Sequence, residues 1–537
     1  MKKLLFVICG LLGVVIVQAQ PLLKTHVETG DVEGVLEGND LACYYAIPFA
    51  APPVGDLRWK APQPAKPWTG VLKAKETAKW PPQPEKSYVK YDMMDEDCLY
   101  LSVVTPAKKV SEALPVMVFI HGGGFRTEHY GGELWQSLAR RGVVTVSVAY
   151  RAGALGYLAH ADLAKENPEG HSGNYGMLDL IFALQWVQRN IQNFGGDPAK
   201  VTIFGESAGA MSCNILCASP LAKGLFRACI SESGAFMSPL SLIDQTTAQM
   251  LGYLFMNQLQ KKSIAELRQM DAKSLTGNDV NFQGSTPIID GYVMPAPLYD
   301  LYQKGEYYDV PVLIMYNSDE GAVEFDSVSE EMFNQQVSQL PGHWGDSLKV
   351  YYPGRTDEER LYSLRDLVRD LNFGWPAYAW ATLQKQTGKS PVYMAYLAQK
   401  SDTTVYAKGN RRGAAHADDI MYLKGAFDNK ADKYPQEKKV GDLMQQYWVN
   451  FAKTGGNPNG WSSESHQAGL DGRVVTDEGE ANGKGLPAWP VFDEQKPTVM
   501  QFNNGASLVD VPNKERIALI DRFCQYIRDL RAGKATQ

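Results

Sequence analysis

Apolar residues occur in short uninterrupted runs through the middle of the chain, and stretches with a helical pattern lie between them. The runs at 116–120 (VMVFI) and 143–149 (VVTVSVA) are rich in β-branched residues, which is typical of strands buried on both faces of a parallel sheet. Between Met177 and Phe194, apolar residues recur with the period of a helix, and the sequence Gly-Gly-Asp-Pro that begins at Gly195 ends it. Further strands are expected at 201–204, 228–231, 310–316, 392–397 and 499–502. This alternation predicts an α/β fold, with a mainly parallel central sheet and helices on both faces.

The first residues have the pattern of an export signal. Lys2 and Lys3 precede an apolar run at 4–17, and Ala19 offers a small residue at the expected cleavage point. The run is short for a membrane span, which needs about 20 residues. We therefore expect residues 1–19 to be a cleaved signal peptide, with no stable membrane span after cleavage and a periplasmic or extracellular location. A retained anchor is the alternative.

Composition excludes some classes of protein. Hydrophobic residues make up 44% and charged residues 21% of the 537 positions, as in ordinary globular proteins, so a disordered or fibrous chain is not expected. The net charge of −7 argues against a nucleic-acid binder, which usually carries a basic footprint. Beyond the apolar run the cysteines are Cys43, Cys98, Cys213, Cys217, Cys229 and Cys524. Their spacing resembles no metal site, and we expect mostly reduced, buried thiols. A bridge between Cys43 and Cys98 is the one disulfide to consider.

The segment Gly205-Glu206-Ser207-Ala208-Gly209 has the G-x-S-x-G pattern, and it lies between an expected strand and an expected helix. In that context the tight turn forces the serine into a strained backbone conformation, and only glycine fits on either side. The turn presents the Ser207 hydroxyl at the edge of the sheet, which makes Ser207 a candidate nucleophile. A glycine-rich turn with an incidental serine is the alternative.

A serine nucleophile needs a base, and it needs donors for the oxyanion that forms on the attacked carbonyl. The segment His121-Gly122-Gly123-Gly124 directly follows an expected strand. Because glycine lets backbone N–H groups approach a substrate oxygen closely, we expect the N–H groups of Gly123, Gly124 and Ala208 to form the oxyanion hole. A flexible loop is the alternative. A phosphate cradle is less favoured, since no lysine-bearing phosphate motif follows.

Several long motifs occur together in the chain: EDCLYL (96–101), HGGGF (121–125), GNYGMLDLIFALQWVQRNIQNFGGDP (173–198) and GESAG (205–209). In this order they resemble the type-B carboxylesterase/cholinesterase family of α/β hydrolases. Similar stretches at 46–59, 150–158 and 450–459 extend the resemblance over almost the whole chain. The resemblance implies the α/β-hydrolase fold, a single catalytic domain at 20–537, and a serine hydrolase of carboxylic esters that needs no metal or organic cofactor.

The resemblance also implies the partners of Ser207. The acid of the family is a glutamate in an N-x-D-E-G motif, which here is 317–321, so Glu320 is expected to orient the base. Asp319 is the local competitor. The base of the family lies in an H-x-x-acid-aliphatic motif late in the chain, and His416 matches it. His121 is expected to support the glycine loop rather than to act as the base.

Other matches imply supporting roles. Ser233 corresponds to a serine that forms a hydrogen bond near the triad in the family, and Glu206, beside the nucleophile, is expected to add negative potential to the pocket. Two pairs match structural salt bridges of the family: Arg58 with Glu96, and Arg151 with Asp179.

We therefore expect a serine carboxylic-ester hydrolase that acts through an acyl-enzyme on a small to medium ester, with no nucleic-acid partner. The segment 80–97 contains no cysteine and no clear counterpart of the family's choline-binding tryptophan, so acetylcholine is not the expected substrate. The alternatives are deacylation of a carbohydrate or phenolic ester and, less favoured because all three triad residues are present, a non-catalytic binding module. Phe373, Trp375 and Tyr378 line the pocket entrance or pack in the core; the sequence leaves both open, as it does the oligomeric state.

Overall fold

A mixed sheet of 11 strands forms the centre of the computed structural model, which describes residues 20–86, 89–127, 135–241, 243–277, 282–338, 344–401, 410–460 and 486–534. Its strands in chain order are β3 (Val35–Glu37), β4 (Leu41–Pro48), β6 (Tyr100–Thr105), β7 (Leu114–Ile120), β8 (Val144–Val148), β9 (Gly196–Glu206), β10 (Ala228–Glu232), β11 (Val312–Asn317), β12 (Val392–Leu397), β13 (Thr498–Phe502) and β14 (Ala506–Asp510). The spatial order is β14-β13-β12-β11-β10-β9-β7-β8-β6-β4-β3. A separate small sheet contains β1 (Lys24–Val27), β2 (Gly30–Glu33) and β5 (Val71–Lys73).

The strands from β8 to β13 in the spatial order are parallel to one another, and antiparallel strands occur only at the two sides of this sheet. On one side β6, β4 and β3 alternate in direction, and on the other β14 pairs antiparallel with β13. Every run predicted as a strand forms one, so the mainly parallel sheet is confirmed. One boundary was wrong: Gly195 alone ends the helix, at φ +79°, and β9 already begins at Gly196, so the rest of Gly-Gly-Asp-Pro belongs to the strand.

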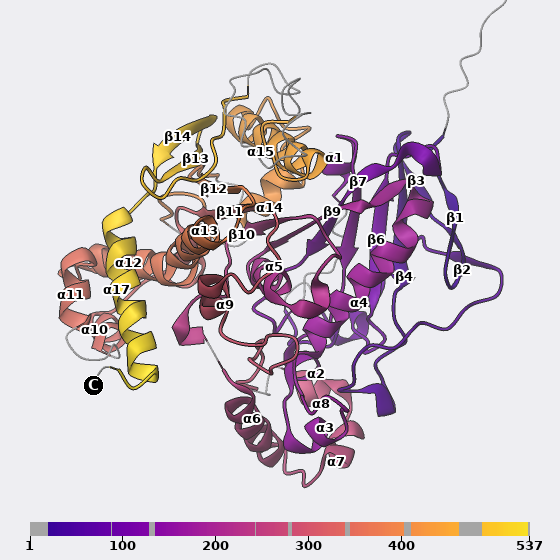
Figure 1. The fold of residues 1–537 in the computed structure, drawn as a ribbon, viewed down its shortest axis with the longest axis horizontal. Coiled ribbons are helices and arrows are strands. Elements are labelled where there is room, and N and C mark those ends of the chain that lie inside the picture. Colours follow the sequence, from indigo (N-terminus) through magenta and orange to yellow (C-terminus); the bar gives the residue numbers. More distant parts are fainter. Residues whose placement is uncertain are drawn as a thin grey trace, which may run out of the picture.

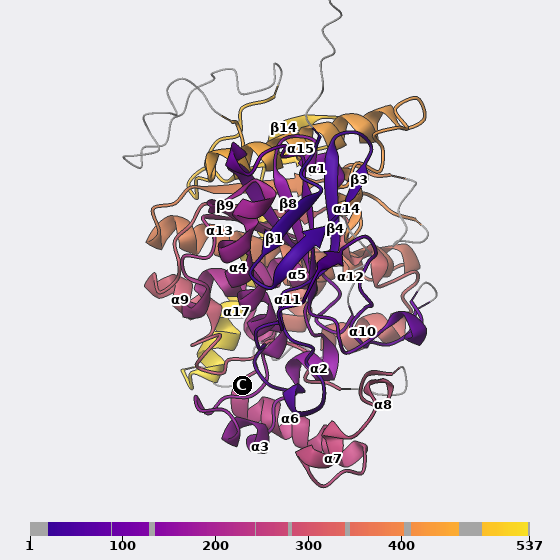
Figure 2. The same cartoon turned by 90° about the vertical axis from the view of Figure 1, so that its right-hand side faces the viewer.

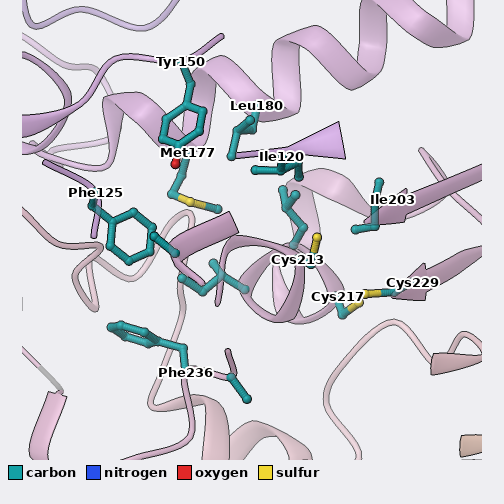
Figure 3. Close-up of a cluster of buried hydrophobic side chains, with 14 of the residues drawn as sticks. Ile120, Phe125, Tyr150, Met177, Leu180, Ile203, Cys213, Cys217, Cys229 and Phe236 are labelled. Atoms are coloured by element: carbon teal, nitrogen blue, oxygen red, sulfur yellow. The ribbon is translucent and has the colours of Figure 1, made fainter. Parts of the chain in front are cut away.

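Helices cover both faces of the sheet (Figure 1). On one face lie α4 (Tyr175–Asn190), α5 (Ala208–Ala218), α9 (Leu298–Lys304) and α13 (Trp375–Thr387), and on the other lie α1 (Gln136–Ala139), α14 (Asp418–Leu423) and α15 (Pro435–Thr454). Successive residues of β7 point to opposite faces: Val116 and Val118 join the first cluster, whereas Met117 and Phe119 join the second. This alternation explains why the strand reads as an unbroken apolar run. Figure 3 shows the first cluster between α4, α5 and the sheet.

Two groups of helices lie away from the sheet. The helices α2 (Gly153–Tyr157), α3 (Ala161–Lys165), α6 (Gln245–Gln258), α7 (Ile264–Arg268) and α8 (Ala272–Thr276) gather at the lower end of the molecule in Figures 1 and 2. The helices α10 (Glu330–Ser338), α11 (Trp344–Tyr351), α12 (Asp357–Arg369) and α17 (Lys514–Arg531) form the second group. None of the helices in the described parts of the chain is both long and apolar enough to cross a membrane. The predicted signal peptide, residues 1–19, lies outside the described residues and stays a prediction.

All six described cysteines are buried free thiols, so the expectation of reduced core cysteines is confirmed. The bridge considered between Cys43 and Cys98 is wrong. Cys43 packs in a small cluster beside Leu41, whereas Cys98 belongs to the large cluster on the first face of the sheet. Burial raises the pKa of the Cys43 thiol to about 12, so it has no tendency to ionise there.

The two salt bridges expected from the sequence both form. The guanidinium of Arg58 binds the Glu96 carboxylate through Nε (2.8 Å) and Nη2. Asp179, on α4, is completely buried, and its two oxygens accept from Arg151 at Nη2 (2.7 Å), at Nε (2.8 Å) and at the backbone N–H (3.0 Å). The second pair therefore fixes the segment after β8 to the helix that covers the sheet.

We expect Asp179→Asn to lower the free energy of unfolding by about 3–5 kcal/mol, because the change leaves the buried Arg151 guanidinium without its counter-ion. Denaturant unfolding followed by far-UV circular dichroism measures the change. The matched control is Asp162→Asn, which removes one partner of an exposed ion pair with Lys165 and should change stability by less than about 1 kcal/mol. Equal effects of the two variants would contradict the structural role of Asp179.

Candidate active site

Ser207 occupies a sharp turn between β9 and α5. Its backbone has φ +58° and ψ −122°, a conformation that a residue with a side chain adopts only under strain. The flanking glycines are required by space: a Cβ on Gly205 would lie 2.6 Å from the carbonyl carbon of Gly209, and a Cβ on Gly209 would lie 2.0 Å from the carbonyl oxygen of Ile120. The turn therefore raises the half-buried Ser207 side chain above the carboxyl end of β9, as the sequence motif predicts.

His416 stands directly over this serine. It lies on the segment between β12 and α14, and its Nε2 is 2.8 Å from Ser207 Oγ. Its Nδ1 is 2.6 Å from Glu320 Oε2, so Nδ1–H donates to the carboxylate, and Nε2 faces the serine hydroxyl. Three residues that are far apart in the chain thus form one continuous series of hydrogen bonds.

Glu320 is fully buried just after β11, and three groups fix its carboxylate. Oε1 accepts from Ser233 Oγ (2.6 Å) and from the Asn317 backbone N–H (2.7 Å), while Oε2 faces His416. Such bonds hold the carboxylate in one orientation, which in turn fixes the imidazole tautomer. The competitor Asp319 points elsewhere, because its Oδ2 accepts from the Arg412 backbone N–H (2.7 Å).

The glycine loop that follows β7 lies against the serine turn. Gly123 and Gly124 have φ values of +111° and +62°, and a Cβ on Gly123 would lie 2.1 Å from the Thr127 carbonyl oxygen. His121 is buried beneath the loop and stacks on the ring of Tyr150, with ring centres 4.2 Å apart. Its Nδ1 donates to the Gly122 carbonyl (2.7 Å), and its own carbonyl accepts from Tyr150 Oη (2.9 Å). His121 therefore supports the loop, and it is not the ring that touches Ser207.

A cavity of about 660 Å³ opens above these groups. The described residues around it include Phe119, Gly122, Gly123, Gly124, Glu206, Ser207, Glu320, Val368, Phe373, His416 and Ile420. Of the three aromatic residues left open by the sequence, only Phe373 lines the cavity, with its ring centre 4.9 Å from that of His416. Trp375 is completely buried and donates from Nε1 to Asp521 (2.9 Å), and Tyr378 packs edge-on against Phe492.

Negative charge surrounds His416. Glu206 Oε1 lies 3.3 Å from His416 Nε2, and Glu320 lies at Nδ1. Burial lowers the pKa of His416, but the charges of Glu206 and Glu320 outweigh it and raise that pKa to about 10. The site therefore stabilises the imidazolium form of His416. Within the described residues, no group of His, Cys, Asp or Glu side chains could hold a metal ion.

Two further carboxylates adjoin residues of the site, and sequence reasoning missed them. Glu232 precedes Ser233 and ends β10, and Asp419 is the acidic residue of the H-x-x-acid motif; both are fully buried. Glu232 is adjacent to Ser233, and Asp419 belongs to the same motif as His416. This proximity to assigned residues could have identified both carboxylates from the sequence. The Glu232 carbonyl accepts from the Ser207 backbone N–H (2.8 Å), but neither carboxylate bonds to the serine hydroxyl, so each can act on the reaction only through a neighbour.

The arrangement matches known proteins. The sequence model of the Carboxylesterase family matches residues 19–520. A fumonisin B1 esterase of Sphingopyxis macrogoltabida is 33% identical over 88% of this chain and 89% of its own length, and a human cocaine esterase is 30% identical over 92% and 91%. A solved PNB esterase superposes with a TM-score of 0.75 at 30% identity, covering 94% of this chain and all of that one.

We expect Ser207 to react covalently with a fluorophosphonate probe, and His416→Ala to slow that reaction by about 10²–10⁴-fold, because the variant lacks the general base. Peptide mapping by mass spectrometry identifies the labelled residue. Ser212→Ala is the matched control: this buried serine lies on the same helix, where its Oγ donates to the Ala208 carbonyl (2.9 Å), and its loss should leave labelling intact. Label on another serine in the wild-type protein would contradict the assignment.

The charge of Glu206 gives a prediction for pH dependence. Labelling requires neutral His416 and is lost as pH falls through the pKa of that histidine. Glu206→Gln removes a charge that raises this pKa, so the acid limb of the labelling rate should move to lower pH. Glu324→Gln, also at the cavity but not among the groups with the largest effect on the pKa of His416, should move the limb much less. An upward shift in the Glu206 variant would contradict the assignment.

Proposed function

The chain belongs to the carboxylesterase family and is a carboxylic-ester hydrolase, and we propose that it cleaves a small to medium ester through an acyl-enzyme formed on Ser207. The observation that carries this proposal is the unbroken series of hydrogen bonds from Ser207 Oγ through His416 to Glu320. Nucleophile, base and orienting acid are already within bonding distance, so no rearrangement is needed to begin the reaction.

In the first step His416 Nε2 takes the proton of Ser207 as Oγ attacks the ester carbonyl carbon. The carbonyl π electrons move to oxygen, and the resulting oxyanion lies towards the glycine loop. We assign the backbone N–H groups of Gly123, Gly124 and Ala208 as its donors, since the loop borders the same cavity as Ser207 and Ala208 directly follows the nucleophile at the start of α5. The positive end of the α5 dipole adds to this stabilisation.

Collapse of the tetrahedral intermediate breaks the bond to the alcohol oxygen, which takes the proton from His416. Water then enters, His416 takes its proton, and the same steps release the acid and restore Ser207. Glu320 remains ionised throughout, with Ser233 and Asn317 holding it, and it balances the imidazolium at each stage. Glu206 adds a second negative charge at Nε2.

The cavity supports an ester of drug-like size. Its volume of about 660 Å³ lies within the about 300–1,000 Å³ range of small-molecule sites, and Phe119, Phe373 and Ile420 offer apolar surface to an acyl or alcohol group. Among its relatives are a fumonisin B1 esterase and a cocaine esterase, which supports a small-molecule ester as the substrate. Carbohydrate or phenolic esters remain the alternative substrates. We further propose export through residues 1–19, as the sequence pattern predicts.

A non-catalytic binding module is the competing function. It would have no need for a strained serine, an aligned base and a buried acid together, since strain at Ser207 lowers stability without helping a surface to bind. The geometry of all three residues therefore favours the enzyme.

Hydrolysis of p-nitrophenyl acetate, butyrate and octanoate by the mature chain tests the proposal. We expect activity on at least one ester, and a loss of about 10⁴-fold or more in kcat for Ser207→Ala, because the acyl-enzyme can no longer form. Ser212→Ala should retain activity. A folded wild-type protein that hydrolyses none of the three, or an active Ser207→Ala variant, would contradict it. The preferred chain length measures the room available to the acyl group.

A further inference from the structure

Glu232 and Asp419 are two carboxylates with no assigned role, and both are shielded from solvent. Each has one oxygen satisfied by a neutral donor. Glu232 Oε1 accepts from Trp448 Nε1 (2.5 Å), and Asp419 Oδ1 accepts from Asn317 Nδ2 (2.9 Å). Neither residue has an arginine or lysine partner among the bonds and ion pairs of the described residues.

The second oxygen of each carboxylate has no hydrogen-bond donor in the described part of the chain. Glu232 Oε2 and Asp419 Oδ2 are both buried, and neither receives a hydrogen bond from any described residue. The two side chains are nevertheless within hydrogen-bonding reach of each other. Two ionised carboxylates are acceptors only and cannot bond, so this arrangement would leave two buried charges side by side without a donor. A single proton between them satisfies both oxygens at once.

We propose that Glu232 and Asp419 hold one proton in common, with Glu232 as the carboxylic acid that donates to the Asp419 carboxylate, and that this pair is a positioning device for the triad. The proposal deepens the esterase function of the same site and rests on it. The pair carries one negative charge instead of two, and that charge lies on the residue nearer to His416 in the chain.

The surroundings favour this proton. The titratable groups that face the pair are Glu206 at the end of β9, Glu320 after β11, His416 before α14 and Cys213 on α5, and of these only His416 can become a cation. Burial, the charge of Asp419 and the charge of Glu206 raise the pKa of Glu232 well above its usual range. Burial also raises the pKa of Asp419, to about 6. His416 favours the ionised form of Asp419, whereas the charge of Glu206 disfavours ionisation of Glu232, so the proposal assigns the proton to Glu232.

The pair is connected to the triad by Asn317. The Asn317 amide donates to Asp419 Oδ1 and also to the Ala415 carbonyl (2.9 Å), next to His416, while its backbone N–H donates to Glu320 Oε1 (2.7 Å). A second full charge at Glu232 would add to the negative field that already holds a proton on His416. Because only neutral His416 can accept the Ser207 proton, the shared proton widens the pH range in which the base works.

The acid limb of kcat/KM against pH tests the proposal. Glu232→Gln replaces an uncharged acid by an uncharged amide that still accepts from Trp448 and donates to Asp419, so the limb should not move. In Asp419→Asn the new amide supplies the donor and Glu232 gives up its proton, so the negative charge of the pair moves from Asp419, which acts on His416, to Glu232. The limb should therefore move to lower pH, in the same direction as with Glu206→Gln. A downward shift with Glu232→Gln would mean that Glu232 is ionised, and would overturn the proposal.

The double variant Glu232→Gln/Asp419→Asn gives a second test, on stability. Each single amide supplies the one donor that the pair needs, whereas two amides place two donors opposite each other. The thermal midpoint should therefore fall by clearly more in the double variant than the two single changes add up to. Additive effects would overturn the proposal.

An infrared difference spectrum separates this inference from the esterase function. In the inactive Ser207→Ala protein, the band of a protonated carboxylic acid should be present at neutral pH, and it should be absent after Glu232→Gln. An active esterase without that band overturns the shared proton alone. The band in a protein that hydrolyses no ester would leave the shared proton standing and overturn the proposed function.

Discussion

The strained turn at Ser207 is the constraint on which the rest of the site depends. A residue with a side chain at φ +58° persists only where its surroundings allow no alternative. Here the Ser207 N–H donates to the Glu232 carbonyl (2.8 Å), and Gly209 lies so close to the Ile120 carbonyl that no side chain fits. The turn is thus wedged between β7 and β10, and its position follows from the register of three parallel strands. The fold and the nucleophile cannot be varied independently.

From this fixed point the other groups follow by topology. The carboxyl ends of parallel strands meet at one edge of the sheet, so residues that follow β7, β9, β11 and β12 reach the same cavity although they are distant in the chain. The glycine loop, Ser207, Glu320 and His416 each come directly after, or on the loop following, one of these strands. This explains how three residues from separate loops form hydrogen bonds of 2.8 Å (Ser207 to His416) and 2.6 Å (His416 to Glu320).

The strands of the sheet and the turn at Ser207 could be predicted from the sequence, and the predictions that failed did so for physical reasons. Unbroken apolar runs identify strands buried on both faces, and the need for glycine around Ser207 identifies the turn, because both effects are local. The Cys43–Cys98 bridge was wrong because the two thiols pack in different hydrophobic clusters, which the sequence does not show. Phe373 and Trp375 are two residues apart, yet Phe373, in the turn before α13, lines the cavity, whereas Trp375, the first residue of α13, is buried. Glu232 was missed because burial and partners, rather than residue type, make it unusual.

The electrostatics of the site carry an internal conflict that the structure resolves by geometry. Negative charge at Glu206 and Glu320 stabilises the imidazolium in the transition state, but the same charge raises the pKa of His416 in the resting enzyme, where the imidazole must be neutral. Removing a charge next to the ring would lower the pKa and weaken the stabilisation together. Neutralising a more distant carboxylate, by contrast, reduces the negative potential at His416, while Glu320 keeps its hydrogen bond to Nδ1. The proposed proton between Glu232 and Asp419 therefore lowers the pKa of His416 in the resting enzyme and leaves intact the bond by which Glu320 stabilises the imidazolium.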